Sequence, residues 1–219
     1  GVAPEEIQHV MHGTTVAKNT VLTGTGARVG LVTTTGYRQV LQIARSFVPG
    51  GLGGWVIYNK SLPMAPLSLT IEAHERVSSQ GEVVTALDEA KLREDLRALG
   101  RKKIEALTVS LINAFANDRH EQRIKQIAQQ ELPGIPVSLS SEVVPEMQEY
   151  ERTVTTVANS YVRPRVQKYV HNLKSKLDAK TRNVKLHILR SDGGLASARS
   201  AEDFPVNLLM SGPAGGVTG

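Results

Sequence analysis

Residues 106–139, ALTVSLINAFANDRHEQRIKQIAQQELPGIPVSL, decide the fold class of this chain. Residues 106–112 form an unbroken apolar-rich run, which is typical of a strand buried on both faces. Residues 135–139 predict a second strand after the breaking pair Pro133-Gly134. A helix is predicted between the two strands, because apolar residues recur there at helical spacing: Ile124, Ile127, Ala128 and Leu132. A strand–helix–strand order of this kind indicates an α/β fold with parallel strands.

Two helix starts are predicted from capping residues. Asp118 and Glu121 have the spacing of a capping box, in which each side chain bonds to the backbone of the other residue. Asp88 is expected to cap an earlier helix. The buried face of that earlier helix carries Leu92, Leu96 and Leu99.

The N-terminal part repeats the same alternation. Strands are predicted at residues 7–11 and 27–33, and helices at residues 16–22 and 37–44. Residues 49–67 are rich in glycine and proline and predict an excursion loop. The apolar content of that loop indicates that it packs against a partner chain or a substrate.

The remaining elements are two strands, a long helix and a final strand. Residues 68–86 predict the two strands joined by a turn, and residues 145–177 predict the helix. Pro164 is expected to kink or split that helix, because proline lacks the backbone N–H. Residues 185–189 predict the final strand.

The composition excludes several classes of protein. Cysteine is absent, so a disulfide framework, a thiolate zinc site and a cysteine nucleophile are excluded. No long apolar run or secretory leader is visible, so a cytoplasmic location is expected, with no membrane partner. His9 and His12 are the closest histidines and lie in a predicted strand, where they face opposite sides; we therefore predict no metal-binding residues.

The formal net charge of +5 has a local source. Aromatic residues make up only 4% of the chain, which favours a solvated helix face or a subunit contact over a nucleic-acid surface. We therefore expect no nucleic-acid partner. The basic residues that surround the single acid Asp178 are Arg163, Arg165, Lys168, Lys174, Lys176, Lys180, Arg182 and Lys185.

Residues 12–19, HGTTVAKN, are the first candidate site, because they lie where a strand gives way to a helix. Gly13 permits close approach of a ligand, and the hydroxyls of Thr14 and Thr15 are suited to phosphate or a carbonyl oxygen. Plain helix capping by threonine is the alternative.

Two glycine-rich turns are further candidates. Residues 191–194, SDGG, follow a predicted strand, where Asp192 is suited to organising a metal-bound phosphate or to orienting a water. From spacing alone, an ordinary Asp-Gly turn is the better explanation. Residues 211–219, SGPAGGVTG, suit a backbone that lies against a nucleotide, although they lack the Gly-Lys-Ser/Thr of a P-loop. A structural turn is the alternative there too.

A polar stripe is predicted on the long helix. Helical spacing places Glu149, Arg152, Thr156 and Asn159 on one side, beside the apolar face. These side chains are suited to a polar site, while a surface ion pair between Glu149 and Arg152 is the alternative.

Together, HGTTVAKN, the block from Glu149 to Tyr161 (EYERTVTTVANSY), SDGG and SGPAGGVTG resemble the ATP-dependent A-type subunits of the hydantoinase A, 5-oxoprolinase and acetone/acetophenone carboxylase family. The resemblance covers almost the whole chain. It implies a ribonuclease H-like, actin-like ATPase fold in two lobes. It implies residues 1–140 as an N-terminal α/β region, with the 49–67 excursion, and residues 141–219 as the start of the ATPase domain.

The resemblance also implies a function. ATP and Mg²⁺ would activate a carbonyl or enolate oxygen of a small molecule by phosphorylation, for cyclic-amide hydrolysis or ketone carboxylation. Residues 49–60, PGGLGGWVIYNK, favour the carboxylase branch. The implied partners are a B-type companion subunit and further segments of the same subunit.

The candidate site residues follow by position. The family's site lies between its two lobes, which implies a catalytic group and a cofactor-binding group. The catalytic group is Thr14, Thr15, Asn19, Glu149, Arg152 and Asn159. The cofactor-binding group is Asp192, Gly193, Gly194, Ser211, Gly212, Gly215 and Gly216.

Both phosphate loops of the family are expected outside these residues, one before Gly1 and one after Gly219. Because phosphoryl transfer needs clamped phosphates and metal, we expect an internal fragment that is inactive by itself. The alternative is a non-catalytic scaffold or interaction domain that kept the fold.

Overall fold

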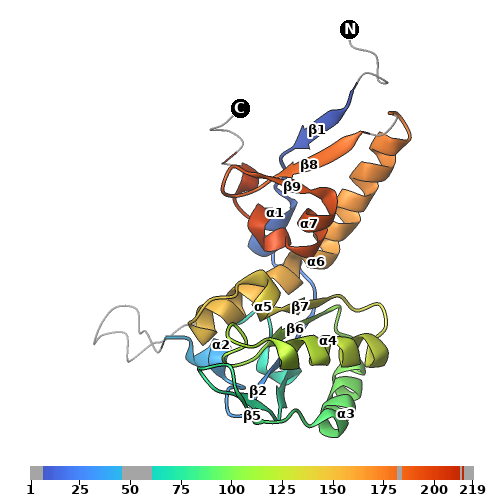
Figure 1. Ribbon diagram of the computed structural model, residues 1–219. Helices are drawn as coiled ribbons and strands as arrows, with labels where there is room; N and C mark the ends of the chain where they lie inside the picture. The colour runs from blue at the N-terminus through green and yellow to red at the C-terminus, as the bar shows by residue number, and fades with distance from the viewer. Residues whose placement is uncertain (1–6, 46–60, 182–183, 213, 215–219) are drawn as a thin grey trace, which may run out of the picture. The chain divides into compact units, whose positions relative to one another are not determined.

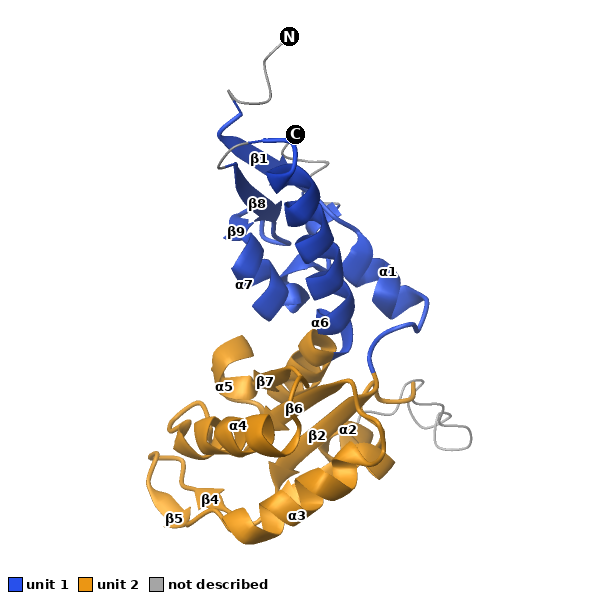
Figure 2. Ribbon diagram, turned by 90° about the vertical axis from the view of Figure 1, so that its right-hand side faces the viewer, with its two compact units in different colours: residues 1–27, 161–219 blue, residues 28–160 orange. Residues whose placement is uncertain are grey.

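The chain forms two compact units. Unit 1 comprises residues 1–27 and 161–219, and unit 2 comprises residues 28–160 (Figure 2). The structure, a computed structural model, describes residues 7–45, 61–181, 184–212 and 214 (Figure 1). Most of the predicted excursion loop, residues 49–60, lies outside the described residues.

Unit 2 is built on a four-stranded parallel sheet in the order β3-β2-β6-β7. All residues of β2, β6 and β7 are buried, as expected of strands covered on both faces. The α/β class and the parallel strands predicted from residues 106–139 are therefore confirmed. The strands are β2 (Val29–Thr34), β3 (Thr70–Ala73), β6 (Ala106–Ser110) and β7 (Val137–Leu139).

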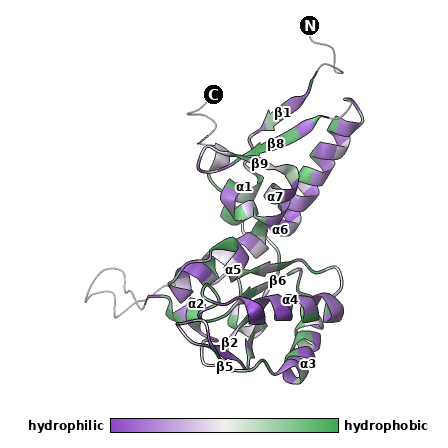
Figure 3. Cartoon of the chain, viewed as in Figure 1, coloured by the Kyte–Doolittle hydropathy of each residue, from purple (hydrophilic) through white to green (hydrophobic). Residues whose placement is uncertain are grey.

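Helices cover both faces of this sheet. Side chains alternate along each strand, so each strand contributes residues to both helix layers. Leu107 and Val109 of β6 join the apolar core formed with α3 (Glu89–Gly100) and α4 (Arg119–Glu131). Thr108 of β6 points to the other face, where its hydroxyl bonds Ser160 of the long helix α6 (Glu149–Asp178) at 2.7 Å. The surface of α4 turned toward the viewer in Figure 3 is largely hydrophilic.

The short elements of unit 2 lie in its connections. The strands predicted at residues 68–86 are β3 and an antiparallel hairpin, in which the turn is closed by Ser78 N–H donating to Glu82 O at 2.8 Å. The short elements are α2 (Val40–Ile43), the 3₁₀ helix η3 (Leu67–Leu69), β4 (Arg76–Val77), β5 (Val83–Thr85) and α5 (Ser140–Val143).

One helix cap is confirmed and the other is wrong. The Asp88 carboxylate accepts from Lys91 N–H at 3.0 Å and caps α3. Asp118 makes no side-chain cap to α4, and Glu121 is fully buried. The capping box fails because Glu121 turns toward the end of the sheet, where Leu111 N–H donates to it at 2.9 Å.

Unit 1 is built on a smaller sheet in the order β1-β8-β9. β1 pairs with β8 in parallel, with His9 opposite Lys185, and β9 pairs with β8 antiparallel. Its core joins β8 to the second half of α6, through Val162, Val166, Val170, Leu186 and Ile188. The elements besides α6 are β1 (His9–His12), α1 (Val16–Leu22), β8 (Lys185–Leu189), β9 (Leu195–Ser197), α7 (Ala198–Asp203) and η4 (Pro205–Leu208).

The compact units group the residues in another way than the sequence division after residue 140, which stays a prediction. Because β1 pairs with β8, the first described residues lie with the C-terminal segment rather than with residues 28–140. The boundary falls inside α6, which runs without a break through Pro164, so the predicted split is absent. Ala27 N–H donates to Tyr161 O at 2.8 Å and ties the helix to the chain near that proline.

No helix among the described residues is both long enough and apolar enough to cross a bilayer.

Gly26 supplies a test of this packing. A Cβ at Gly26 would lie 2.1 Å from Cε1 of Tyr161, so only glycine fits against that ring. We expect Gly26→Ala to lower the free energy of unfolding by about 1–3 kcal/mol, as overpacking does. Thermal unfolding in a double-mutant cycle checks the cause: the cost should shrink when Tyr161→Ala removes the ring. An equal cost in both backgrounds would contradict the steric explanation.

Glu121 supplies a second test. Burial raises the pKa of its carboxyl, and the hydrogen bonds from Ser140, Ser141 and Leu111 offset part of the effect. The folded chain therefore holds this proton more tightly than the unfolded chain. The resulting contribution to stability is complete below the unfolded pKa of about 4.3 and is lost as pH rises through the raised folded pKa.

Glu121→Gln removes this titration. Urea unfolding midpoints measured from pH 4.5 to 8 should fall more steeply with pH in the native sequence than in Glu121→Gln. Parallel pH profiles for the two proteins would show that the folded pKa of Glu121 is not raised.

Candidate functional site

Two segments at opposite ends of the chain meet at the turn between β1 and α1. The Ser211 hydroxyl donates to the Thr14 carbonyl oxygen at 2.9 Å, across 197 residues of sequence. A Cβ at Gly212 would lie 3.1 Å from Cγ2 of Thr15. Ser211 is fully buried and Thr14 is nearly so, which makes this a fixed contact. The HGTT motif and the described start of the SGPAGG motif, Ser211 and Gly212, are therefore neighbours within unit 1.

A cavity of about 660 Å³ opens beside this contact. Its polar wall is the backbone and hydroxyls of residues 13–15 together with Ser211 and Gly212. Its apolar wall includes Tyr169, Leu189 and Leu195. The volume and the mixed lining are those of a small-molecule site.

Thr15 is the exposed hydroxyl of this wall. It occupies the N-cap position of α1 but makes no side-chain cap, and it accepts only a long hydrogen bond, 3.4 Å, from the Asn19 amide. The buried Thr14 hydroxyl accepts from Val16 N–H at 3.2 Å. The Thr14 hydroxyl thus closes a local turn before α1 rather than capping the helix, and the Thr15 hydroxyl is exposed.

Asn19 lines a second cavity, of about 470 Å³, which shares Val16 and Tyr169 with the first. Tyr169 is held from the β1 side, where its hydroxyl and His12 Nε2 lie 2.6 Å apart. The structure thus brings Thr14, Thr15, Ser211 and Gly212 together at the first cavity and places Asn19 at the second.

The turn at residues 191–194 has the contacts of an Asp-Gly turn. Asp192 accepts from Gly194 N–H at 3.0 Å and pairs with Arg190 at 2.7 Å. Gly193 has φ +82°, which favours glycine. Asp192, Gly193 and Gly194 are not among the residues that line the first cavity. Gly215 and Gly216 lie outside the described residues.

The polar stripe of α6 lies in unit 2 and is mostly buried. Arg152 is 1% exposed; its guanidinium donates to Leu111 O at 2.7 Å and to Glu146 O at 2.9 Å, and burial lowers its pKa. Asn159 is fully buried, and its amide donates to Ser138 Oγ at 3.1 Å. Glu149 is exposed at the start of the helix. These contacts join α6 to the end of the unit 2 sheet.

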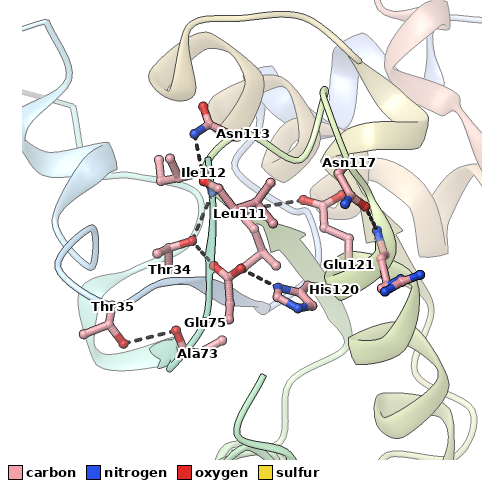
Figure 4. Close-up of polar contacts among 12 residues, drawn as sticks. Thr34, Thr35, Ala73, Glu75, Leu111, Ile112, Asn113, Asn117, His120 and Glu121 are labelled. Atoms are coloured by element: carbon pink, nitrogen blue, oxygen red, sulfur yellow. Dashed lines mark hydrogen bonds and ion pairs between the residues drawn. The ribbon is translucent and has the colours of Figure 1, made fainter. Parts of the chain in front are cut away.

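A second buried polar cluster was not predicted from the sequence (Figure 4). Glu75, fully buried, accepts from the Thr34 hydroxyl and lies 2.7 Å from His120 Nδ1. Ile112 N–H donates to the Thr34 oxygen at 3.0 Å. The members come from four separate segments, so no spacing in the sequence links them. Their polar atoms bond mainly to one another, which favours a structural role.

A metal site is not apparent in the described part of the chain, where no group of three or more His, Cys, Asp or Glu side chains is placed to hold an ion.

Comparison with known proteins identifies related sequences along the chain. The hydantoinase/oxoprolinase N-terminal region model matches residues 1–132, and the hydantoinase/oxoprolinase model matches residues 152–219. The acetophenone carboxylase gamma subunit of Aromatoleum aromaticum is 32% identical over 96% of this chain and 32% of its own length. The chain thus spans about a third of the length of such relatives.

Solved structures share the fold. The ATP-dependent caprolactamase of Pseudomonas jessenii superposes with a TM-score of 0.85 at 30% identity, over 93% of this chain and 30% of that one. A nucleotide-free acetone carboxylase superposes with a TM-score of 0.87 at 23% identity, over 98% of this chain and 31% of that one. These matches confirm the predicted partial actin-like ATPase fold. With sequence models that match residues 1–132 and 152–219, the chain belongs to the hydantoinase/oxoprolinase family.

Proposed function

We propose that this chain is part of an ATP-dependent enzyme subunit that phosphorylates a carbonyl or enolate oxygen of a small molecule. The observation that carries the proposal is the convergence of Thr14 and Thr15 with Ser211 and Gly212 on one cavity. The named activities of the relatives support it, since they include an ATP-dependent caprolactamase and acetophenone carboxylase.

The cavity residues fit a nucleotide phosphate better than they fit a metal ion. Gly13 is exposed and a Cβ added there would approach only Leu189, at 4.0 Å, so the backbone at this turn is open to a ligand. No carboxylate is among the residues that line the cavity. Mg²⁺ would therefore depend on the phosphates and on groups outside this lining.

ATP, when bound, supplies the phosphoryl group. The Thr15 hydroxyl donates to an anionic oxygen of the phosphate or to the substrate oxygen. The small residues Gly13 and Gly212 allow the backbone to approach the ligand. Leu189 and Leu195 contribute apolar surface to the same cavity.

The other candidate residues have less direct roles in this proposal. Arg152 and Asn159 position α6 through their buried contacts, and Glu149 lies at its exposed start. Asp192, Gly193 and Gly194 shape the adjoining turn. Gly215 and Gly216, which lie outside the described residues, are proposed to contact the nucleotide, and the Asn19 amide donates to the Thr15 hydroxyl.

The reaction takes one of two forms. Phosphorylation of a cyclic amide oxygen prepares the ring for hydrolysis, and phosphorylation of an enolate oxygen accompanies carboxylation of a ketone. Further segments of the same subunit and a B-type companion subunit complete the enzyme, in the cytoplasm. ATP hydrolysis by the complete complex, with hydantoin, 5-oxoproline, acetone or acetophenone, each with and without bicarbonate, identifies the substrate. Absence of ATP hydrolysis with every one of these compounds would favour the scaffold alternative.

Thr15 supplies the sharpest test of the site. We expect Thr15→Val, which keeps the shape but removes the hydroxyl, to lower kcat/KM for ATP about 10- to 100-fold, because a hydrogen bond to a charged group is lost. Thr15→Ser keeps the hydroxyl and should retain most of the activity. Steady-state kinetics of the complete complex measures both variants. Equal losses in Thr15→Val and Thr15→Ser would assign Thr15 a packing role instead.

A further inference from the structure

The second cavity of unit 1 adjoins the proposed phosphoryl-transfer site, with which it shares Val16 and Tyr169. It lies between the C-terminal part of α1 and the second half of α6, and its volume is about 470 Å³. Val16 and the ring of Tyr169 form its apolar side. Its polar lining residues are Asn19, Thr20, Thr23, Thr25, Arg165, Lys168 and Asn172.

The charge of this lining is entirely positive. Arg165 and Lys168 contribute two cations, and no carboxylate lines the cavity. Neither cation forms an ion pair within the described part of the chain. Arg165 Nε donates to the Thr25 carbonyl oxygen, which fixes the guanidinium while its terminal nitrogens remain available. Both side chains are exposed, so an anion in this open cavity would meet two cations that no carboxylate pairs but that water partly screens.

The hydroxyls of the lining act as acceptors. Thr23 donates to the Asn19 carbonyl oxygen at 2.8 Å, so the 2.9 Å contact between Thr23 and Thr25 uses the Thr25 proton. Both threonine oxygens then offer lone pairs to a ligand. A ligand that carries a hydroxyl next to its anionic group can place its anionic oxygens on the two cations and donate its hydroxyl proton to a threonine oxygen.

We infer that this cavity binds a small oxyanion that carries a hydroxyl, with the anionic oxygens on Arg165 and Lys168 and the hydroxyl toward Thr23 and Thr25. Two chemical sources fit this description, a 2-hydroxy carboxylate and hydrogen phosphate. The inference does not depend on ATP chemistry in the neighbouring cavity.

Calorimetric titration of the complete protein tests the inference. The probes are glycolate, acetate and inorganic phosphate, at constant ionic strength and with a non-hydrolysable ATP analogue present to block the other cavity. We expect saturable binding of glycolate, of phosphate or of both, with acetate at least about threefold weaker because it lacks the hydroxyl. The probe that binds identifies the source.

Matched variants locate the binding. Lys168→Gln and Arg165→Gln should each weaken binding about tenfold, because each removes a charge-assisted hydrogen bond. Lys174→Gln, an exposed lysine on the same helix outside the lining, should leave binding unchanged. Circular dichroism confirms that the variants fold. Absence of saturable binding, equal binding in Lys168→Gln and Lys174→Gln, or binding of duplex DNA without binding of the small anions would each overturn the inference.

Discussion

The parallel pairing of β1 with β8 is the constraint on which the rest of unit 1 depends. It sets His12 opposite Ile188, and the chain that follows each strand then runs to the same end of the sheet. The turn that holds Thr14 and the segment that holds Ser211 can meet only because of this pairing. The proposed site is therefore a consequence of strand register rather than of either motif alone.

The two units treat their polar groups in different ways. In unit 2, Glu75, Glu121 and Arg152 are buried and bonded to neighbouring groups, so they stabilise the carboxyl end of the sheet and expose almost no polar surface to a ligand. In unit 1, Thr15 and Lys168 are exposed and place their donor groups beside cavities. Buried polar groups that satisfy one another favour structure, whereas open donors favour binding.

Most of the fold could be predicted from local patterns. The strands at residues 106–110 and 185–189 and the helices on either side follow from periodicity and from breaking residues. Local patterns do not specify which distant strands pair, so the sequence did not predict that residues 7–27 join the C-terminal segment. The capping box at Asp118 failed for the same reason, because the partners of Glu121 lie in other elements.

The candidate site was predicted in part. Thr14, Thr15, Ser211 and Gly212 were selected from small-residue motifs, and the structure brings them together. Arg152 and Asn159 have the polar identity of site residues, but only burial distinguishes a ligand contact from an internal bond. No sequence motif marks the cavity that Arg165 and Lys168 line. Its residues come mainly from two helices, and periodicity predicts each helix by itself but not the contact between them.

The discontinuity of unit 1 has a consequence for folding during synthesis. Residues 28–160 form a contiguous stretch, so unit 2 can complete its contacts while the chain is still being made. Unit 1 must wait until β8 leaves the ribosome, and closing so long a loop carries an entropic cost that grows only slowly with its length. Until then, the residues of β1 lack the strand that pairs with them, so a nascent chain stalled before residue 185 would leave the backbone groups that face β8 unpaired.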